Sequence, residues 1–297
     1  MSKLISKNDF RDNCGFGLIA DINGIKSHKI ITKSINALKS MTHRGAIGAD
    51  GKTGDGCGIL IDLDKDFFID ILNKEQNIKI TDEFAIGQIF TKKRIQKVLP
   101  KINKILEEEN LILKAIRNVP INKRILGDIA LECLPKIYQL FIQSSDNTFY
   151  EEKFETNLYQ ARKLIEEIYL DDEELYFCSL SSKTIVYKGL MLPDAIEDFY
   201  LDLKSSKFKS SISVFHQRFS TNTHPRWHLA QPFRLLAHNG EINAIRGNRN
   251  WVKARSSKFK SPRIPKIQQF KQLVNETGSD SSALDNMIEI LINGGVK

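Results

Sequence analysis

The chain has 297 residues, a formal net charge of +8 and a pI near 9.1, with 41% hydrophobic and 27% charged residues. This composition is typical of a globular protein that buries a substantial core, and no run approaches the roughly 18 apolar residues of a membrane span. The first residues lack the apolar segment of a secretory signal, and four scattered cysteines form no disulfide framework. We therefore expect a cytoplasmic protein with no membrane partner.

The first half of the chain predicts a mixture of strands and helices. A polar leader at 1–13 precedes an apolar strand from Cys14 to Ile22, and a helix at 28–42 is followed by the glycine-rich run GADGKTGDGCG. These glycines indicate a shaped surface loop. Further strands are predicted at 59–63, 84–91, 111–117, 137–143, 175–180 and 184–188, and helices at 94–109 and 151–169.

The last third predicts strands at 212–218 and 234–238, a helix near 242–256, a connector rich in Pro and Lys at 258–266 and a final amphipathic helix. The two neighbouring strand signals within 175–188 favour antiparallel pairing. There is no internal repeat or low-complexity linker, so we expect one domain. The lysines interspersed with other residues, as in RIQKVLPKINKILEEEN, are typical of solvated helix faces rather than of a nucleic-acid partner.

Cys14 opens the first predicted strand within the run CGFG. A cysteine at such a place is most often a small buried hydrophobe. Removal of residues 1–13 would instead make it N-terminal, and an α-amine with a pKa of roughly 8 can act as the base of its own nucleophile. That mechanism requires cleavage between Asn13 and Cys14.

A second group of polar residues lies between 213 and 251. Arg218 follows a strand and could hold a carboxylate through both guanidinium nitrogens, although a surface salt bridge is an equally ordinary role. Asn239-Gly240 is a common hairpin turn, yet an Asn amide and a Gly N–H can also stabilise an oxyanion. Four of the six histidines lie between 216 and 238, but no metal-site spacing accompanies them. We therefore expect structural histidines and no metal.

Asp280 lies in the run GSDSS just before the final helix. The ordinary role here is helix capping, and Ser282 with Asp285 also fits a capping box. If the serines cap the helix, the Asp280 carboxylate is available for a substrate ammonium group. A carboxylate holder, an ammonium holder, an oxyanion hole and a nucleophile together suit an amino-acid amide such as glutamine.

The chain resembles the N-terminal glutamine amidotransferase domain of the glutamate synthase large subunit. The resemblance rests on four runs that span residues 14 to 286: CGFGLIADING, MTHRGAIGADGKTGDGCGILI, HQRFSTNTHPRWHLAQPFRLLAHNGEINAIRGNRNW and GSDSSALDN. It implies an α+β fold, namely the four-layer α/β/β/α sandwich of the N-terminal-nucleophile hydrolases, with two antiparallel sheets face to face. It also implies a propeptide at 1–13 and an amidotransferase domain at 14–297.

The resemblance assigns a role to each candidate residue. Cys14 matches the processed nucleophile, and Asn239 with the Gly240 N–H matches the oxyanion hole. Arg218 matches the residue that binds the α-carboxylate of L-glutamine, and Asp280 the one that binds its α-amino group. Glu241, the next residue of the same motif, is expected to bind substrate as well.

The resemblance also implies partners and cofactors. Ammonia would pass to a glutamate synthase catalytic domain or subunit that uses FMN and an iron–sulfur cluster, and we expect no cofactor in this chain because Cys57, Cys133 and Cys178 lack cluster spacing. Two other functions remain open: an inactive or truncated relative that acts as a binding or regulatory module, and a basic nucleic-acid-binding protein. Cleavage before Cys14 distinguishes the active enzyme from the inactive module. A nucleic-acid-binding protein would instead show a steeply salt-dependent affinity for DNA or RNA.

Overall fold

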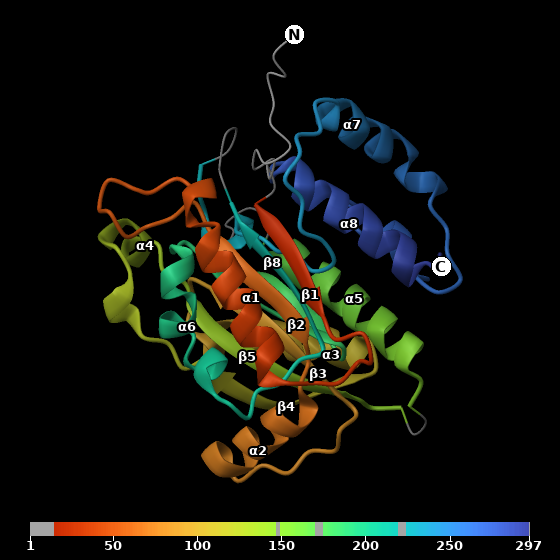
Figure 1. Cartoon of the computed structure of the whole chain (residues 1–297). Helices are drawn as coiled ribbons and strands as arrows, with labels where there is room; N and C mark the ends of the chain where they lie inside the picture. Colours follow the sequence, from red (N-terminus) through yellow and green to blue (C-terminus); the bar gives the residue numbers. More distant parts are fainter. Residues whose placement is uncertain (1–14, 147–148, 170–174, 219–223, 297) are drawn as a thin grey trace.

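The computed structural model describes residues 15–146, 149–169, 175–218 and 224–296 (Figure 1). Cys14 and the leader lie outside these residues. The described strands form two four-stranded sheets, in which all pairs are antiparallel. The first sheet has the order β1 (Phe16–Ala20), β8 (Ile212–Gln217), β2 (Cys57–Asp62) and β7 (Thr184–Gly189), and the second has the order β4 (Leu111–Asn118), β5 (Lys136–Ser144), β3 (Phe84–Thr91) and β6 (Leu175–Ser181).

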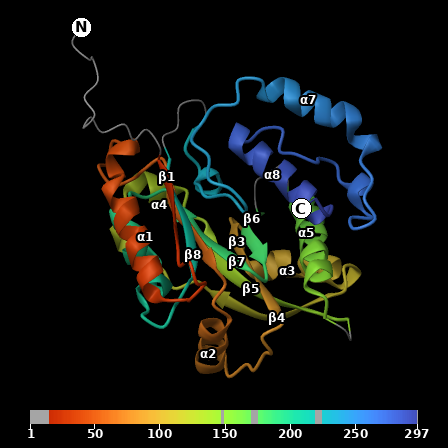
Figure 2. The ribbon, with the colours of Figure 1, turned by 45° about the vertical axis from the view of Figure 1, so that its right-hand side comes forward.

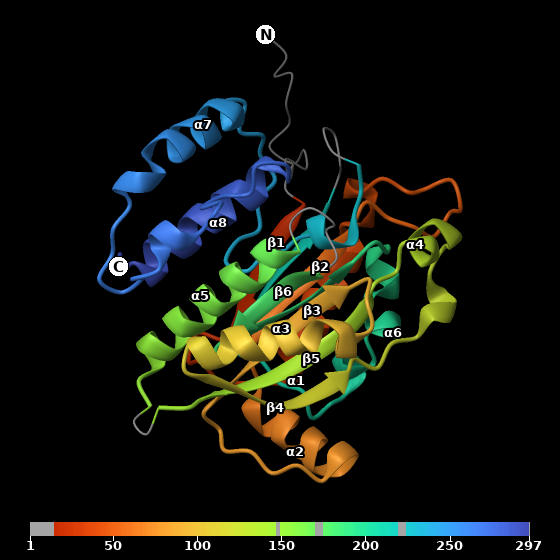
Figure 3. The same ribbon diagram turned by 180° about the vertical axis from the view of Figure 1, so that it is seen from behind.

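The two sheets stack and helices cover their outer faces, which confirms the predicted α+β sandwich. Helix α1 (His28–Ser40) packs on β1 and β8 of the first sheet (Figure 1), and α3 (Ile95–Glu108) and α5 (Glu151–Ile168) cover the second sheet (Figure 3). Strand β6 of the second sheet leads through a short turn into β7 of the first sheet, and the two strands contact each other, so this pair connects the sheets (Figure 2).

Strand β3 shows how the sequence specifies these layers. Its residues alternate between two cores: Phe84, Ile86 and Phe90 belong to the core shared with the first sheet, whereas Ala85 and Ile89 pack with α3 and α5. Both faces of β3 are therefore buried, and the sequence of a strand with two buried faces is a nearly continuous apolar run. This explains why the run FAIGQIFT predicts the strand with its correct bounds.

The other five described helices lie outside the two covering layers. Helices α2 (Lys65–Gln76) and α4 (Asp128–Glu132) were not predicted, and α6 (Ile196–Phe199) is a single turn. Helices α7 (Ile245–Arg255) and α8 (Asp280–Asn293) lie together at one side of the sandwich (Figure 1). In the described part of the chain no helix is both long and apolar enough to cross a bilayer.

The predicted strand at 234–238 is wrong, because this segment is irregular. Side chains bind its backbone groups in place of a neighbouring strand: Leu235 N–H donates to the Asp285 carboxylate at 2.9 Å, and His238 N–H donates to Gln231 Oε1 at 2.9 Å. An apolar run such as RLLAH therefore satisfies its buried polar groups without a sheet ladder.

Candidate active site

Arg218 lies directly after β8, where the glycine-rich loop holds it. Its N–H donates to the Gly56 carbonyl at 2.8 Å and its Nη1 donates to the Asp55 carbonyl at 3.3 Å. Only 6% of the residue is exposed, and this burial lowers the pKa of the guanidinium, while Asp55 acts in the opposite direction. Arg218 is thus a buried cation held at the end of the first sheet rather than an exposed surface charge.

The glycine-rich loop is only partly a surface loop. Gly56 is buried and has a φ of 128°, and a Cβ at this position would lie 2.8 Å from the Ala230 side chain. Only glycine combines this backbone conformation with so close an approach. The run does form a loop whose glycines are structurally required, as predicted. Its second half is largely buried and binds Arg218, so only its first half is a surface loop.

The Asn239 side chain lies against Gly15, the residue that follows Cys14 in the chain. A Cβ on Gly15 would lie 3.2 Å from Asn239 Oδ1, 3.5 Å from Asn239 Nδ2 and 2.5 Å from the Gln217 carbonyl. The carbonyl contact leaves no room for a side chain at Gly15, so the start of the first sheet and the Asn239 amide approach closely. The structure therefore brings together two parts of the chain that are more than 200 residues apart.

Asn239, Gly240 and Glu241 are exposed and irregular, so the hairpin turn is excluded. A Cβ on Gly240 would lie 2.8 Å from His238 Nε2, which explains why glycine follows Asn239. The N–H of Gly240 and the amide of Asn239 are thus adjacent donors on an exposed segment. Such a pair can meet a developing oxyanion.

Asp280 is the first residue of α8, and Ser279 caps the helix by accepting a hydrogen bond from Ser282 N–H at 3.1 Å. The expectation that a serine caps this helix is confirmed. The predicted capping box is wrong, because Ser282 lies inside the helix and Asp285 accepts from Leu235 instead.

The Asp280 carboxylate is already engaged with the main chain. Its Oδ2 accepts from Ile242 N–H at 2.7 Å and its Oδ1 accepts from Ser281 N–H at 2.6 Å. Asp280 thereby ties the segment after Glu241 to α8. A carboxylate has about four acceptor positions, so capacity remains for a substrate ammonium group, but the carboxylate is not as free as the sequence suggested.

Comparison with known proteins decides the family. A profile described as glutamine amidotransferases class-II matches residues 14–297. The chain belongs to this family. It is 41% identical over 299 residues to ferredoxin-dependent glutamate synthase 1 of Arabidopsis thaliana, covering 96% of this chain and 18% of that protein. It is 38% identical to the large chain of the NADPH glutamate synthase of Azospirillum brasilense, covering 97% of this chain and 19% of that protein.

The NADH glutamate synthase of Saccharomyces cerevisiae is 42% identical over 298 residues, which are 95% of this chain and 14% of that protein. The chain thus spans about a fifth or less of the length of these relatives. The resemblance seen in the sequence motifs is confirmed, and the chain is a class-II glutamine amidotransferase domain.

His216, which the sequence analysis treats as a structural histidine, lies beside the segment of Asn239. It lies in β8, is 1% exposed, and donates from Nε2 to the His238 carbonyl at 3.2 Å. Burial lowers its pKa to about 4, although the His238 carbonyl and the Asn239 side chain act to raise it. The imidazole is therefore neutral near pH 7, with its proton on Nε2.

The described residues show no metal or cluster site. No group of three or more His, Cys, Asp or Glu in them could hold a metal ion. Cys57 and Cys178 are buried in strands of different sheets and Cys133 is exposed after α4, so these three thiols do not fit an iron–sulfur cluster.

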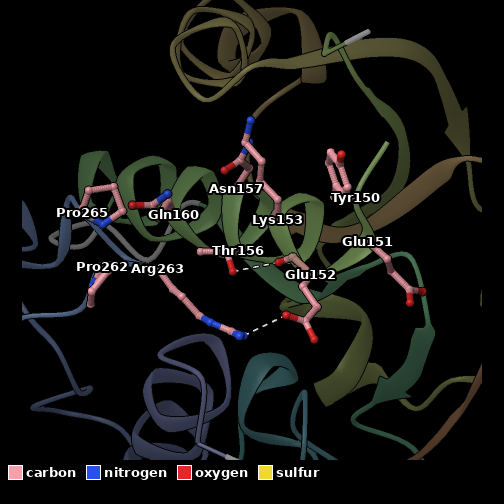
Figure 4. A pocket seen from close by; sticks show the side chains of 10 residues that line it. All are labelled: Tyr150, Glu151, Glu152, Lys153, Thr156, Asn157, Gln160, Pro262, Arg263 and Pro265. Atoms are coloured by element: carbon pink, nitrogen blue, oxygen red, sulfur yellow. Dashed lines mark hydrogen bonds and ion pairs between the residues drawn. The ribbon is translucent and has the colours of Figure 1, made fainter. Parts of the chain in front are cut away.

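A separate hollow of about 620 Å³ lies between the start of α5 and the connector after α7. Tyr150, Thr156 and Arg263 are among its lining residues, and Arg263 pairs with Glu152 at 3.0 Å (Figure 4). None of the predicted site residues lines this hollow, so we do not assign the amidotransferase chemistry to it.

Proposed function

We propose that this domain hydrolyses L-glutamine to glutamate and ammonia with Cys14 as an N-terminal nucleophile, in the manner of the N-terminal-nucleophile hydrolases. The observation that supports this most strongly is the approach of the Asn239 amide to Gly15. Gly15 is bonded to Cys14, and consecutive Cα atoms are about 3.8 Å apart. The proposed oxyanion donor therefore lies about one residue from the proposed nucleophile.

The proposed reaction uses the α-amine that removal of residues 1–13 would create. The amine accepts the thiol proton, and the sulfur attacks the side-chain carbonyl carbon of glutamine. The amide of Asn239 and the N–H of Gly240 stabilise the oxyanion of the tetrahedral intermediate. Ammonia leaves after the amine returns the proton to it, and water then hydrolyses the thioester to glutamate.

The substrate's amino-acid end would bind between Arg218 and Asp280. The Arg218 guanidinium pairs with the α-carboxylate and the remaining acceptor positions of Asp280 bind the α-ammonium group, with Glu241 nearby in the sequence motif. Because Arg218 is held by the glycine-rich loop and Asp280 begins α8, the two charges come from separate elements of the fold. Free amino acids that carry both charges would therefore be preferred over simple amides.

Two of the other cysteines are poor alternatives to Cys14. Burial raises the pKa of the Cys57 thiol well above its usual range and that of Cys178 to about 12. A thiolate is the reactive form, so these two side chains are chemically inert near pH 7. Cys133 is exposed, and its Sγ lies 3.3 Å from the Ile129 carbonyl. Cys133 therefore offers a control for an accessible thiol outside the site.

We further propose that the ammonia serves glutamate synthesis from 2-oxoglutarate in a synthase domain or subunit, which would hold the FMN and the iron–sulfur cluster. The glutamate synthase names of the relatives support this fate. The chain itself would need no cofactor for glutamine hydrolysis. The free thiols of Cys57, Cys133 and Cys178 support a cytoplasmic place of action.

Replacement of Cys14 tests the proposal directly. Cys14→Ala should abolish glutamate release from glutamine, because it removes the nucleophile, whereas the matched variant Cys133→Ala should retain the wild-type rate. Glutamate release by Cys14→Ala at the wild-type rate would refute the mechanism. An inactive wild-type chain with a correctly folded domain would instead favour a binding or regulatory module.

A further inference from the structure

The peptide of His238, which precedes the proposed oxyanion residue Asn239, is held by two buried side chains. Gln231 binds both of its polar groups: Nε2 donates to the His238 carbonyl at 3.0 Å and Oε1 accepts from His238 N–H at 2.9 Å. His216 Nε2 donates to the same carbonyl at 3.2 Å. Three hydrogen bonds therefore converge on one residue of a segment that has no regular structure.

Both side chains come from rigid surroundings. Gln231 is 6% exposed, and its main chain packs on β2, since a Cβ on Gly58 would lie 2.6 Å from the Gln231 carbonyl. His216 belongs to β8 and is 1% exposed. The His238 peptide is thus connected to the first sheet by hydrogen bonds from a residue of β8 and from a residue packed on β2. Asn239 follows directly in the chain, so the orientation of the His238 peptide constrains where Asn239 lies.

We propose that Gln231 and His216 are positioning residues of the oxyanion hole, which fix the His238 peptide and thereby aim the Asn239 amide and the Gly240 N–H at the developing oxyanion. This inference rests on the proposed function. Neither side chain touches the substrate in this arrangement. Gln231 acts through His238, because an amide that binds both the N–H and the C=O of one residue sets the orientation of that residue, as a neighbouring strand would. His216 acts through the His238 carbonyl and also through a hydrogen bond with the Asn239 side chain.

A positioning role of this kind affects the chemical step more than glutamine binding. The oxyanion exists only in the transition state and intermediate, while Arg218 and Asp280 bind the other end of the substrate. Removal of one oxyanion donor typically lowers kcat by about 100-fold or more, and a small misplacement of a catalytic group has effects of similar size. We therefore expect a fall in kcat of about 10-fold to 100-fold when the hydrogen bonds of Gln231 to His238 are lost, with little change in KM.

The first test compares Gln231→Met with Gln160→Met. Methionine keeps the length of glutamine but removes both hydrogen-bonding ends. Gln160 is a matched control, because it is 3% exposed and also uses both ends of its amide, donating to Glu109 and accepting from Lys266 N–H. We expect Gln231→Met to lower kcat for glutamine while Gln160→Met leaves kcat unchanged, even where both variants melt at a lower temperature.

His216→Phe provides a second variant that should fold. His216 Nδ1 is buried and has no hydrogen-bond partner among the described residues, so phenylalanine removes an unsatisfied polar atom. The His238 carbonyl keeps its bond from Gln231. We expect a smaller fall in kcat than for Gln231→Met, without a lower melting temperature. That combination would not arise from a purely structural role.

Alkylation of Cys14 by iodoacetamide separates failure of this inference from failure of the proposed function. Alkylation forms no oxyanion, so its rate, followed by mass spectrometry, should be the same in the wild type, Gln231→Met and His216→Phe. Equal kcat values in wild type and both variants would overturn the positioning role. A wild-type chain that releases no glutamate would overturn the proposed function instead.

Discussion

Asp285 belongs to a buried ion cluster that joins α5, the segment before Asn239 and α8. Arg234 pairs with Glu166 at 2.8 Å, with Asp285 at 3.6 Å and with Glu289 at 3.8 Å. Asp285 is fully buried, and its Oδ2 has no hydrogen-bond partner among the described residues. Burial, and then the charge of Glu289, raise the pKa of Asp285 to about 6, although Arg234 acts to lower it.

The raised pKa predicts that Asp285→Asn stabilises the domain at neutral and alkaline pH. An Asp with a pKa of 3.8 in the unfolded chain and about 6 in the folded one binds its proton more tightly when folded. Its contribution to stability is complete below about pH 4 and is lost as pH rises through 6. The shift of about 2 units corresponds to about 3 kcal/mol. Asparagine keeps the Oδ1 acceptor for Leu235 N–H and carries no charge.

Urea unfolding of the wild type and Asp285→Asn at several pH values measures this effect. We expect the variant to gain up to about 3 kcal/mol of unfolding free energy near pH 8, and the difference to vanish near pH 4. The control is Asp82→Asn, the same substitution at an exposed residue, which should leave the unfolding free energy nearly unchanged. A variant that is less stable than the wild type near pH 8 would refute the reasoning, because it would mean that the attraction of Arg234 outweighs burial.

Two further predictions concern the predicted substrate-binding charges and α8. Arg218→Lys keeps the charge but loses the planar pair of donors, so KM for glutamine should rise by about 10-fold with a smaller change in kcat, as steady-state kinetics would measure; an unchanged KM would remove Arg218 from the carboxylate site. Ser279→Ala removes the cap of α8 and should lower the unfolding free energy by about 1 kcal/mol, which urea unfolding measures, whereas Ser257→Ala on the exposed connector should have no effect.

The sequence pattern predicts all eight described strands but misses three described helices, α2, α4 and α6. Strands such as β3 and β5 are long apolar runs with both faces buried, so their pattern was sufficient. Helix α2 was missed, although Asp64 caps it by accepting from Phe67 N–H. The false strand at 234–238 is apolar in sequence, and the side chains that replace its ladder come from Gln231 and from α8, 50 residues away in the case of Asp285.

The candidate site could be predicted residue by residue only through the family motifs. The structure places Asn239 beside Gly15 and ties Ile242 to Asp280, contacts that no local pattern reveals. The roles of Cys14, Arg218, Asn239, Gly240, Glu241 and Asp280 in catalysis and binding remain predictions. Gln231 and His216 were missed because both bind the main chain of His238, and no side-chain motif in the sequence reveals such a contact.

The lysines of α3 lie on its exposed face, as the sequence predicts, but the net positive charge of the chain is concentrated in another segment. Residues 242–275 hold nine of the 44 Lys and Arg and none of the 36 Asp and Glu, so the remainder of the chain carries no net positive charge. This segment includes α7, none of whose residues is buried. Composition along individual helices did not reveal this segregation, because it extends over a helix and the connector that follows it.

The central claim is that an N-terminal Cys14 hydrolyses glutamine. The intact mass of the purified chain, determined on the sample used for a glutamate-release assay, tests it most directly. The account predicts a mass that lacks residues 1–13 together with release of glutamate from glutamine. Glutamate release by a chain that still carries its leader, or a chain that begins at Cys14 and releases none, would contradict it.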